Sequence, residues 1–536
     1  MSGPIGSSQL MYSAGAGDFY SHQIANSCRF VKVQDNFGAS SYMYHTNGTP
    51  TDVDKCTISC WVKRANTGSS LNGAMMFTGS GKNGGGYSFH GFGGDGATDE
   101  FYLMQDPGSV NARLESTAFF RDVGAWYHIV VAQDSTQGTA ANRNKVYING
   151  DLYTDWGDYS TYVTQNADFL QNTSGYNLFV GSGGASDGAV HLPFDGYIAE
   201  YVFIDGTQND VSDFGETKNG VWVPKDPSGL TFGNNGVYLK FQNSAALGDD
   251  SSGNNNDFTL ANISAHDQML DSPTFNSSSN GGNFCTINPI YSGTAIAGAS
   301  AKRGTITEGN LKHSYASNND ASCPCTIKVP PSGKWYFEYA IIAGGGSGDY
   351  SPAMGIIDPN VYTNADAGTN TTGLVCYVNY NNKARKNGTF TATYGGSRGS
   401  NGDVMGIAVD MDNGAFYVSK NGTFQAIDGG STGDPTSGAS KTGAGATWTP
   451  ASEFTSGMIP ISQPTGGSAP VINLNFGQDG TFQGTETAGG NADANGFGNF
   501  FTSPPTDYLA ICTGNLPTPS TDPADDNEPT KNHGCI

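Results

Sequence analysis

Short apolar runs separated by Gly, Asn, Asp and Ser organise the first half of this chain. Each run is rich in aromatic and β-branched residues, which favour strands, and the polar residues between the runs favour turns. Short strands at this spacing are typical of an antiparallel sandwich. The pattern therefore predicts a β-sandwich over residues 27–245. Its apolar runs lie at 27–30, 56–63, 87–92, 101–104, 126–132, 145–149, 178–181, 194–205 and 236–241.

The clearest local signal is a hairpin over residues 145–153. The dipeptide Asn149-Gly150 lies there between two apolar runs. A two-residue hairpin turn needs residues that tolerate positive φ, and Asn and Gly are the residues that do so most readily. We therefore expect a tight turn at these two positions.

A second patterned region, over residues 331–517, predicts another antiparallel sandwich. Its apolar runs lie at 333–339, 354–357, 374–377, 403–410 and 471–476. Between the two regions, residues 246–330 contain long polar stretches such as 248–257. These stretches predict a partly ordered connector instead of a third large core.

Both ends of the chain differ from the patterned regions. Residues 1–26 are rich in Gly and Ser but contain Tyr12, Phe19 and Tyr20, so we expect this segment to order only by docking on another subunit. Residues 518–536 have hardly an apolar group and cannot offset the entropy of ordering. They predict a flexible C-terminal tail.

Composition excludes several classes of protein. The 536 residues include 76 Gly, only 14% are charged, and the formal net charge is −23. Few Glu, Lys and Arg argue against helix bundles, and an acidic chain is a poor partner for nucleic acid. No run approaches the length of a spanning helix, and residues 1–20 lack the regions of a secretory signal, so we expect neither membrane insertion nor export by that route. The nine Cys are irregularly spaced, and we interpret most of them as reduced and buried.

The runs WYHIVVA at 126–132, KVYING at 145–150 and FDGYIAEYVFIDG at 194–206 resemble the laminin-G-like modules of the concanavalin A-like lectin and glucanase superfamily. The runs GKWYFE at 333–338, GDVMGIAVD at 402–410 and NGAFYVSKNG at 413–422 are similar to a SPRY domain. The resemblance implies an all-β protein of two antiparallel jelly-roll sandwiches, joined by the partly ordered connector.

The pairing of these two modules resembles virion proteins of tailed bacteriophages, especially marine ones. The resemblance also covers the linking runs at 247–258, 271–274 and 283–289 and the closing run at 509–517. It implies a virion surface protein that is assembled in the host cytoplasm. Its implied partners are other virion proteins and host-surface glycan or protein, with the chain present in many copies or as a homo-oligomer. Neither nucleic acid nor a membrane is implied as a partner.

Paired carboxyl groups on one strand would indicate a glucanase. The glucanases of the superfamily carry Glu-x-Asp-x-x-Glu on one strand, because retaining hydrolysis needs two carboxyl groups close together. This chain has no such run. Glu200 and Asp205 come nearest, but an odd separation of five points them to opposite faces of a regular strand. No Ser, His and Asp arrangement emerges, and His128 fits a hydrogen-bonded histidine of a half-buried strand. We therefore expect no catalytic residues and no enzyme.

Calcium is the one metal that the resemblance suggests, since many laminin-G-like modules hold it through Asp and Asn oxygens at the rim of the sandwich. Asp95 and Asp99, in a Gly-rich acidic loop, are the candidate ligands, although such a loop can also be merely solvated. No other cofactor is expected.

An aromatic cluster is the remaining functional signal. Sugars stack their apolar faces on Tyr or Trp while Asp and Asn bind the hydroxyl groups. The residues Tyr153, Trp156, Tyr159 and Tyr162 form such a cluster. They are candidates for binding glycan, and the alternative is that they pack on the sheet or against a neighbouring subunit.

Two hypotheses about function follow, with a third behind them. In the first, the chain is a tail fibre or adhesin that binds host-surface glycan or protein. In the second, it is a structural or decoration protein of the capsid or tail, whose sandwiches mainly bind other virion proteins. A polysaccharide depolymerase is a third and weaker alternative.

Overall fold

The computed structural model describes residues 19–33, 36–67, 75–93, 99–158, 160–275, 281–290, 304–315, 322–344, 352–360, 372–428, 430–463 and 469–516. From Ser27 onward the regular elements in these ranges are strands and three-residue 3-10 helices. The all-β fold class predicted from the sequence is confirmed. Among the described residues no helix is long and apolar enough to cross a membrane. The chain divides into two compact units, one up to Thr274 and the other beginning at Phe275.

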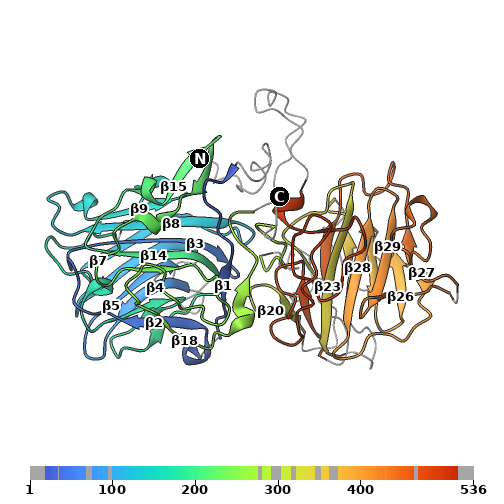
Figure 1. The fold of residues 1–536 in the computed structure, drawn as a ribbon, viewed down its shortest axis with the longest axis horizontal. Helices are drawn as coiled ribbons and strands as arrows, with labels where there is room; N and C mark the ends of the chain where they lie inside the picture. The colour runs from blue at the N-terminus through green and yellow to red at the C-terminus, as the bar shows by residue number, and fades with distance from the viewer. Residues whose placement is uncertain are drawn as a thin grey trace. The chain divides into compact units, whose positions relative to one another are not determined.

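Two sheets build the first unit (Figure 1). The eight-stranded sheet has the order β10 (Asp151–Tyr153), β9 (Asn144–Ile148), β8 (Trp126–Asp134), β3 (Lys55–Arg64), β14 (Gly196–Asp205), β1 (Ser27–Phe30) and β19 (Gln268–Met269), with β17 (Val237–Leu239) paired to β14. The seven-stranded sheet has the order β18 (Thr259–Ala261), β2 (Tyr42–Thr46), β11 (Asn177–Val180), β4 (Met75–Gly81), β5 (Tyr87–Phe92), β6 (Glu100–Asp106) and β7 (Ala112–Phe119). Two further hairpins pair β12 (Gly183–Gly184) with β13 (Val190–His191), and β15 (Gly215–Lys218) with β16 (Val221–Pro224).

The core of the first unit follows from the alternation of side chains along each strand. On β3, Cys56, Ile58, Cys60 and Val62 all point into one apolar cluster, which the seven-stranded sheet completes. Cys56 and Cys60 therefore lie on one face of the strand, as free thiols. All eight cysteines among the described residues are buried and free, as predicted.

The predicted hairpin turn is confirmed. Asn149 and Gly150 have φ values of 50° and 89° and join β9 directly to β10. The strands pair with Ile148 opposite Asp151, which leaves these two residues as the whole turn.

The described end of the predicted docking segment packs on its own unit. Phe19, Tyr20 and Ile24 are buried, and the amide of Ile24 donates to Oγ1 of Thr274 at 2.8 Å. The hydroxyl of Ser272 donates back to the carbonyl of Ile24 at 2.5 Å. Residues 19–26 thus find packing and hydrogen-bond partners within their own chain. The rest of the predicted segment lies outside the described residues.

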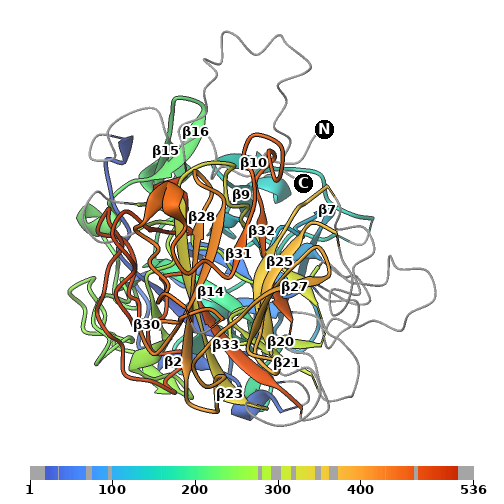
Figure 2. The same cartoon turned by 90° about the vertical axis from the view of Figure 1, so that its right-hand side faces the viewer.

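The second unit, which faces the viewer in Figure 2, also contains two sheets. The nine-stranded sheet has the order β20 (Thr305–Thr307), β21 (Lys312–Ser314), β33 (Val471–Asn475), β23 (Lys334–Ala343), β28 (Val404–Asp410), β29 (Ala415–Lys420) and β30 (Thr423–Phe424), with β31 (Ala446–Thr447) on β29 and β34 (Leu509–Ala510) on β23. The six-stranded sheet has the order β22 (Cys323–Pro324), β32 (Ile459–Gln463), β24 (Ala353–Ile357), β25 (Leu374–Val378), β26 (Lys383–Lys386) and β27 (Thr389–Thr393).

The eight 3-10 helices among the described residues all lie in connections between strands. They are η2 (Phe37–Ala39), η4 (Ala140–Asn142), η5 (Leu170–Asn172), η6 (Val211–Asp213), η7 (Pro227–Gly229), η8 (Ala265–Asp267), η10 (Gly438–Ser440) and η11 (Thr513–Asn515).

The stretch expected to be a connector, 246–330, is divided between the two sandwiches. Its strands β18 and β19 belong to the sheets of the first unit, and β20, β21 and β22 belong to those of the second. The polar run at 248–257 is ordered by its own side chains: Asp250 accepts from the amide of Tyr238 at 2.9 Å, and Asn254 and Asn256 both donate to the carbonyl of Gly236. Polar composition here marks a hydrogen-bonded loop and not a loose linker. The predicted tail at 518–536 lies outside the described residues.

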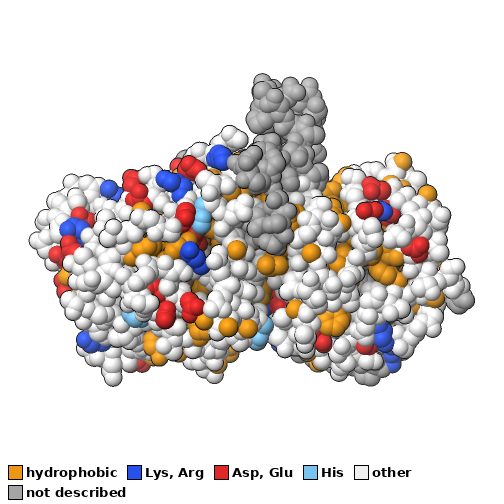
Figure 3. All heavy atoms as spheres, in the orientation of Figure 1, with side chains coloured by type: hydrophobic (Ala, Val, Ile, Leu, Met, Phe, Trp, Pro, Cys, Tyr) orange, Lys and Arg blue, Asp and Glu red, His pale blue; other side chains and the backbone are white. Residues whose placement is uncertain are grey.

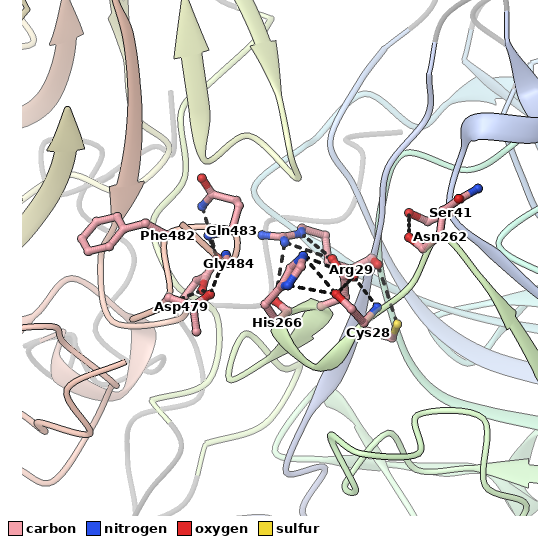
Figure 4. A network of polar contacts seen from close by, with 12 residues as sticks. Cys28, Arg29, Ser41, Asn262, His266, Asp479, Phe482, Gln483 and Gly484 are labelled. Carbon is pink, nitrogen blue, oxygen red and sulfur yellow. Dashed lines mark hydrogen bonds and ion pairs between the residues drawn. The ribbon is translucent and has the colours of Figure 1, made fainter. Parts of the chain in front are cut away.

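Buried polar networks fasten loops within each unit (Figure 4). In the first unit the guanidinium of Arg29 donates to Oδ1 of Asp267 at 3.0 and 3.2 Å, which ties β1 to η8. In the second unit Asp479 accepts from the amides of Thr481 and Gln483 at 3.1 and 2.9 Å and closes a turn.

Asp205 is a buried carboxylate of the first unit that accepts several hydrogen bonds. Its side chain is 2% exposed and accepts from the amides of Thr51 at 2.7 Å and Asn235 at 3.0 Å and from Nδ2 of Asn172 at 2.7 Å. We predict that Asp205→Ala lowers the free energy of unfolding of this unit by about 3 kcal/mol or more, since several buried donors lose their acceptor. Calorimetry should show a lower Tm for one transition. Asp151→Ala, at the exposed first position of β10, is the control and should change the Tm little.

Candidate functional site

The loop at 153–162 covers the free edge of β7 in the first unit. The amide of Gly157 donates to the carbonyl of Glu115 at 2.8 Å, and the amide of Thr117 donates to the carbonyl of Asp155 at 3.1 Å. Trp156 pairs with Ser116 in an isolated bridge. An edge strand exposes unpaired backbone groups, so this loop has a structural task in addition to any binding task.

The structure brings Tyr153 and Trp156 together. Their ring centroids lie 4.9 Å apart at an interplanar angle of 67°, and Oη of Tyr153 accepts from the amide of Ala118 at 3.0 Å. Trp156 and Tyr162 are half-buried against the core of the first unit, with the Trp156 ring 6.4 Å from that of Phe101. Tyr159 lies outside the described residues. Tyr153, Trp156 and Tyr162 are therefore each partly packed against the protein, as the alternative interpretation expects, and partly exposed to solvent.

An exposed aromatic side chain ends β7, the strand whose edge this loop covers. Phe119, at the end of β7, is 51% exposed and follows Ala118 directly. We call Phe119, Tyr153 and Trp156 the aromatic rim. Its polar neighbours include Asp155, whose carboxylate accepts from Oγ1 of Thr117 at 2.6 Å. Half-exposed rings beside a carboxylate and a hydroxyl match the chemistry of a sugar ring, which has apolar faces and an equatorial belt of hydroxyl groups. Sequence reasoning named Tyr153 and Trp156 but missed Phe119, because a single aromatic residue at the end of a strand gives no signal of exposure.

Asp99, one of the two calcium candidates, has both carboxylate oxygens in ion pairs. Oδ1 lies 2.9 Å from the Arg64 guanidinium and Oδ2 lies 2.8 Å from Nε of Arg121. A calcium ion at Asp99 would have to displace one of these cations. Asp95 lies outside the described residues. Within the described ranges no group of three or more His, Cys, Asp or Glu side chains is placed to hold a metal ion.

A serine and a histidine do meet in the first unit. Oγ of Ser59 lies 2.9 Å from Nε2 of His128, and Nε1 of Trp222 donates to Nδ1 of His128 at 2.9 Å. Because the indole N–H can only donate, Nδ1 is the unprotonated nitrogen and Nε2 carries the hydrogen. His128 therefore donates to Ser59 and cannot take its proton. Burial lowers the pKa of His128 to about 3, and Trp61 stacks on its ring at 4.6 Å. The expectation of a hydrogen-bonded structural histidine is confirmed, although the strand is buried on both faces and not half-buried.

Glu200 and Asp205 belong to separate networks. The register of β14 shifts between Ala199 and Val202, and Glu200 occupies this bulge with a φ of 50°. Its carboxylate accepts from Oη of Tyr238 at 2.6 Å and lies 2.5 Å from Nε2 of His22. Because β14 is bulged here and is not the regular strand expected from the sequence, the odd spacing of Glu200 and Asp205 does not explain why they are apart. Each carboxylate is held by its own set of donors.

The comparisons with known proteins agree with the fold of the first unit. Residues 37–210 match a family described as the concanavalin A-like lectin/glucanases superfamily. No curated protein matches the chain. Solved structures similar to parts of it include the SPRY domain of human HERC1, with 15% identity over 31% of this chain and 87% of that one and a TM-score of 0.22.

Two further solved structures are similar at this low level. The native heptameric SAP-like pentraxin from Limulus polyphemus has 13% identity over 38% of this chain and 94% of that one, with a TM-score of 0.27. A putative carbohydrate binding protein from Bacteroides ovatus has 17% identity over 45% of this chain and 60% of that one, with a TM-score of 0.30.

The contact between His22 and Glu200 makes the first unit sensitive to pH. Burial lowers the pKa of His22, but the hydrogen bond and charge of Glu200, with the charge of Asp226, outweigh burial and the repulsion of Lys240, so the pKa is raised overall. A raised pKa in the folded state means that the contact stabilises fully below the unfolded pKa of about 6.5 and is lost as the pH rises through the folded value.

We therefore predict that His22→Gln, which keeps a donor but loses the charge, lowers the Tm of the first unit most at about pH 5.5 and least at about pH 8.5. Calorimetry of both proteins across this range measures the difference. A difference that grows with pH would contradict the assignment of the raised pKa to the Glu200 contact.

Proposed function

We propose that this protein is a non-enzymatic glycan-binding protein of the bacteriophage particle surface, of the tail fibre or adhesin type. The observation that carries the proposal is the aromatic rim on a sandwich that matches the lectin and glucanase superfamily over residues 37–210. Phe119, Tyr153 and Trp156 offer ring surface to a sugar, and Asp155 offers a carboxylate to its hydroxyl groups.

The absence of catalysis is supported by how the polar side chains are used. Among the described residues, the carboxylates nearest to a glucanase pair, Glu200 and Asp205, are committed to separate hydrogen-bond networks. Ser59 meets a histidine that is locked as its donor. Binding without turnover is therefore the function that this geometry supports best.

The particle surface is proposed from the resemblance of the paired modules and their linking runs to phage virion proteins. A shallow rim that binds one or two sugar units gives weak affinity, and many copies on one particle would raise the overall avidity. In this proposal the copies also contact other virion proteins. Neither nucleic acid nor a membrane is a partner.

A glycan array probed with the full chain tests the proposal. We predict binding to a subset of host polysaccharides and a loss of about threefold to tenfold in affinity for Trp156→Phe, which retains an apolar ring against the core but offers less stacking surface. Ile290→Ala, at a 42% exposed apolar position of the second unit, is the control and should leave this binding unchanged.

If the array shows no binding to any host polysaccharide, the result would favour the alternative. In that case the chain is a structural or decoration protein of the capsid or tail that binds other virion proteins. Release of reducing sugar from a bound polysaccharide would instead identify a depolymerase and refute the non-enzymatic proposal.

A further inference from the structure

The hairpin of β26 and β27 in the second unit presents an aromatic ring between cationic side chains. Phe390 is 41% exposed at the edge strand of the six-stranded sheet. Nζ of Lys383 lies 5.2 Å from the centroid of its ring, and Cζ of Arg385 lies 4.9 Å from it. We call Lys383, Arg385 and Phe390 the cationic hairpin site. The ring and both cations lie within the distance at which cation–π attraction holds side chains in place.

The hairpin is held rigidly. Asn387 and Gly388 have φ values of 50° and 77° and form a two-residue turn, and the amide of Gly373 donates to Oδ1 of Asn387 at 2.7 Å. Nε of Arg385 donates to the carbonyl of Gly388 at 2.9 Å, and Lys386 forms an ion pair with Glu453 at 2.6 Å. A ligand would therefore meet side chains that are already positioned, which reduces the entropy lost on binding.

The charge of this hairpin is unusual for the chain. The whole protein has a net charge of −23, yet three of its 25 Lys and Arg residues occupy positions 383–386. On the face that Figure 3 draws, Lys and Arg side chains are few and scattered. Among the described residues no carboxylate forms an ion pair with Lys383, whereas Glu453 neutralises Lys386. The site is thus a local concentration of positive charge on an acidic molecule.

The first unit contains a contrasting arrangement. Phe119 is also exposed, and Cζ of Arg121 lies 4.2 Å from the centroid of its ring. There the guanidinium is paired with the buried carboxylate of Asp99 at 2.8 Å. A ring with a neutralised cation has little attraction for an anion. Lys383, beside Phe390, forms no ion pair with a carboxylate among the described residues, so the two exposed phenylalanines should differ in the charge of the ligand they accept.

We propose that the cationic hairpin site binds an acidic polysaccharide, one whose sugar units carry carboxylates. The Phe390 ring packs against the apolar face of a sugar unit, and the ammonium group of Lys383 attracts its carboxylate. Thr393, an exposed residue of the same edge strand that pairs with Lys383, is available to the sugar hydroxyls. This site is in the second unit and does not depend on the aromatic rim.

The size and composition of the site favour a polysaccharide over a macromolecule of another class. Stable protein interfaces bury about 1,000 Å² or more around an apolar core, whereas Phe390 and Ile290 are the large apolar side chains of the second unit that the described residues show as exposed. Nucleic acid binding needs several phosphate contacts, and the surrounding negative charge opposes it. One aromatic ring with a few polar and charged groups is sufficient for a sugar.

The test compares binding of the full chain to polygalacturonate, to neutral dextran and to polyglutamate by biolayer interferometry. We expect binding to polygalacturonate that weakens at least fivefold between about 50 and 200 mM salt, because charged contacts are screened. Phe390→Ala and Lys383→Gln should each lower the affinity by about fivefold to tenfold, which corresponds to about 1 to 1.4 kcal/mol.

Matched variants separate this site from the aromatic rim and from unfolding. The loss of affinity on Phe390→Ala should be the same in a Trp156→Phe background, and Val110→Ala, at a 54% exposed apolar position in neither site, should leave polygalacturonate binding unchanged. Unchanged calorimetric transitions in the Phe390 and Lys383 variants establish that both proteins are folded. A failure of the rim to bind glycan would not alter these results, so the two proposals fail separately.

Three outcomes would overturn the inference. They are no binding to polygalacturonate, equal binding by the Phe390→Ala variant, and polyglutamate binding as tight as that of polygalacturonate. The last would show that the site attracts negative charge without recognising a sugar. Binding to dextran with the same dependence on Phe390 would assign a neutral sugar instead and would equally refute an acidic ligand.

Discussion

Burial of the central strands on both faces is the constraint from which the rest of the first unit follows. β3, β8 and β14 are buried at nearly every position, because their inner faces meet the seven-stranded sheet and their outer faces are covered by loops and the β15–β16 hairpin. A polar side chain on such a strand must find all its hydrogen-bond partners inside the protein. His128 and Asp205 do so, and each is therefore a fixed part of the structure.

This constraint also decides where function can reside. Ser59, His128 and Glu200 are residue types that can take part in catalysis. Here their side chains form hydrogen bonds that hold strands and loops together. The groups that remain for other molecules lie where strands end or where a sheet has an edge. The aromatic rim beside β7 and the hairpin of β26 and β27 are both of this kind. An arrangement of this kind suits recognition at edges, with a rigid body behind each site.

Prediction from the sequence succeeded where the signal was local and failed where long-range partners decided the outcome. The turn at Asn149 and Gly150 was predictable because its conformation is a property of those two residues. The polar run at 248–257 misled because its Asn and Asp side chains bond backbone groups distant in the chain, as Asn254 and Asn256 do with Gly236. The bulge at Glu200 gave no warning either, since a Glu with positive φ persists only when Tyr238 and its surroundings hold it.

The amino-acid sequence alone determined the strands, the class of fold and the separation into two patterned regions, because alternation and turn chemistry act over a few residues. It also named Tyr153 and Trp156 as neighbours. Only the tertiary structure decided that Phe119 is exposed at the end of β7, that Asp99 is shared by two guanidinium groups, and that Lys383 and Arg385 flank Phe390. Exposure and charge balance depend on which distant segments meet, and that information is absent from any local pattern.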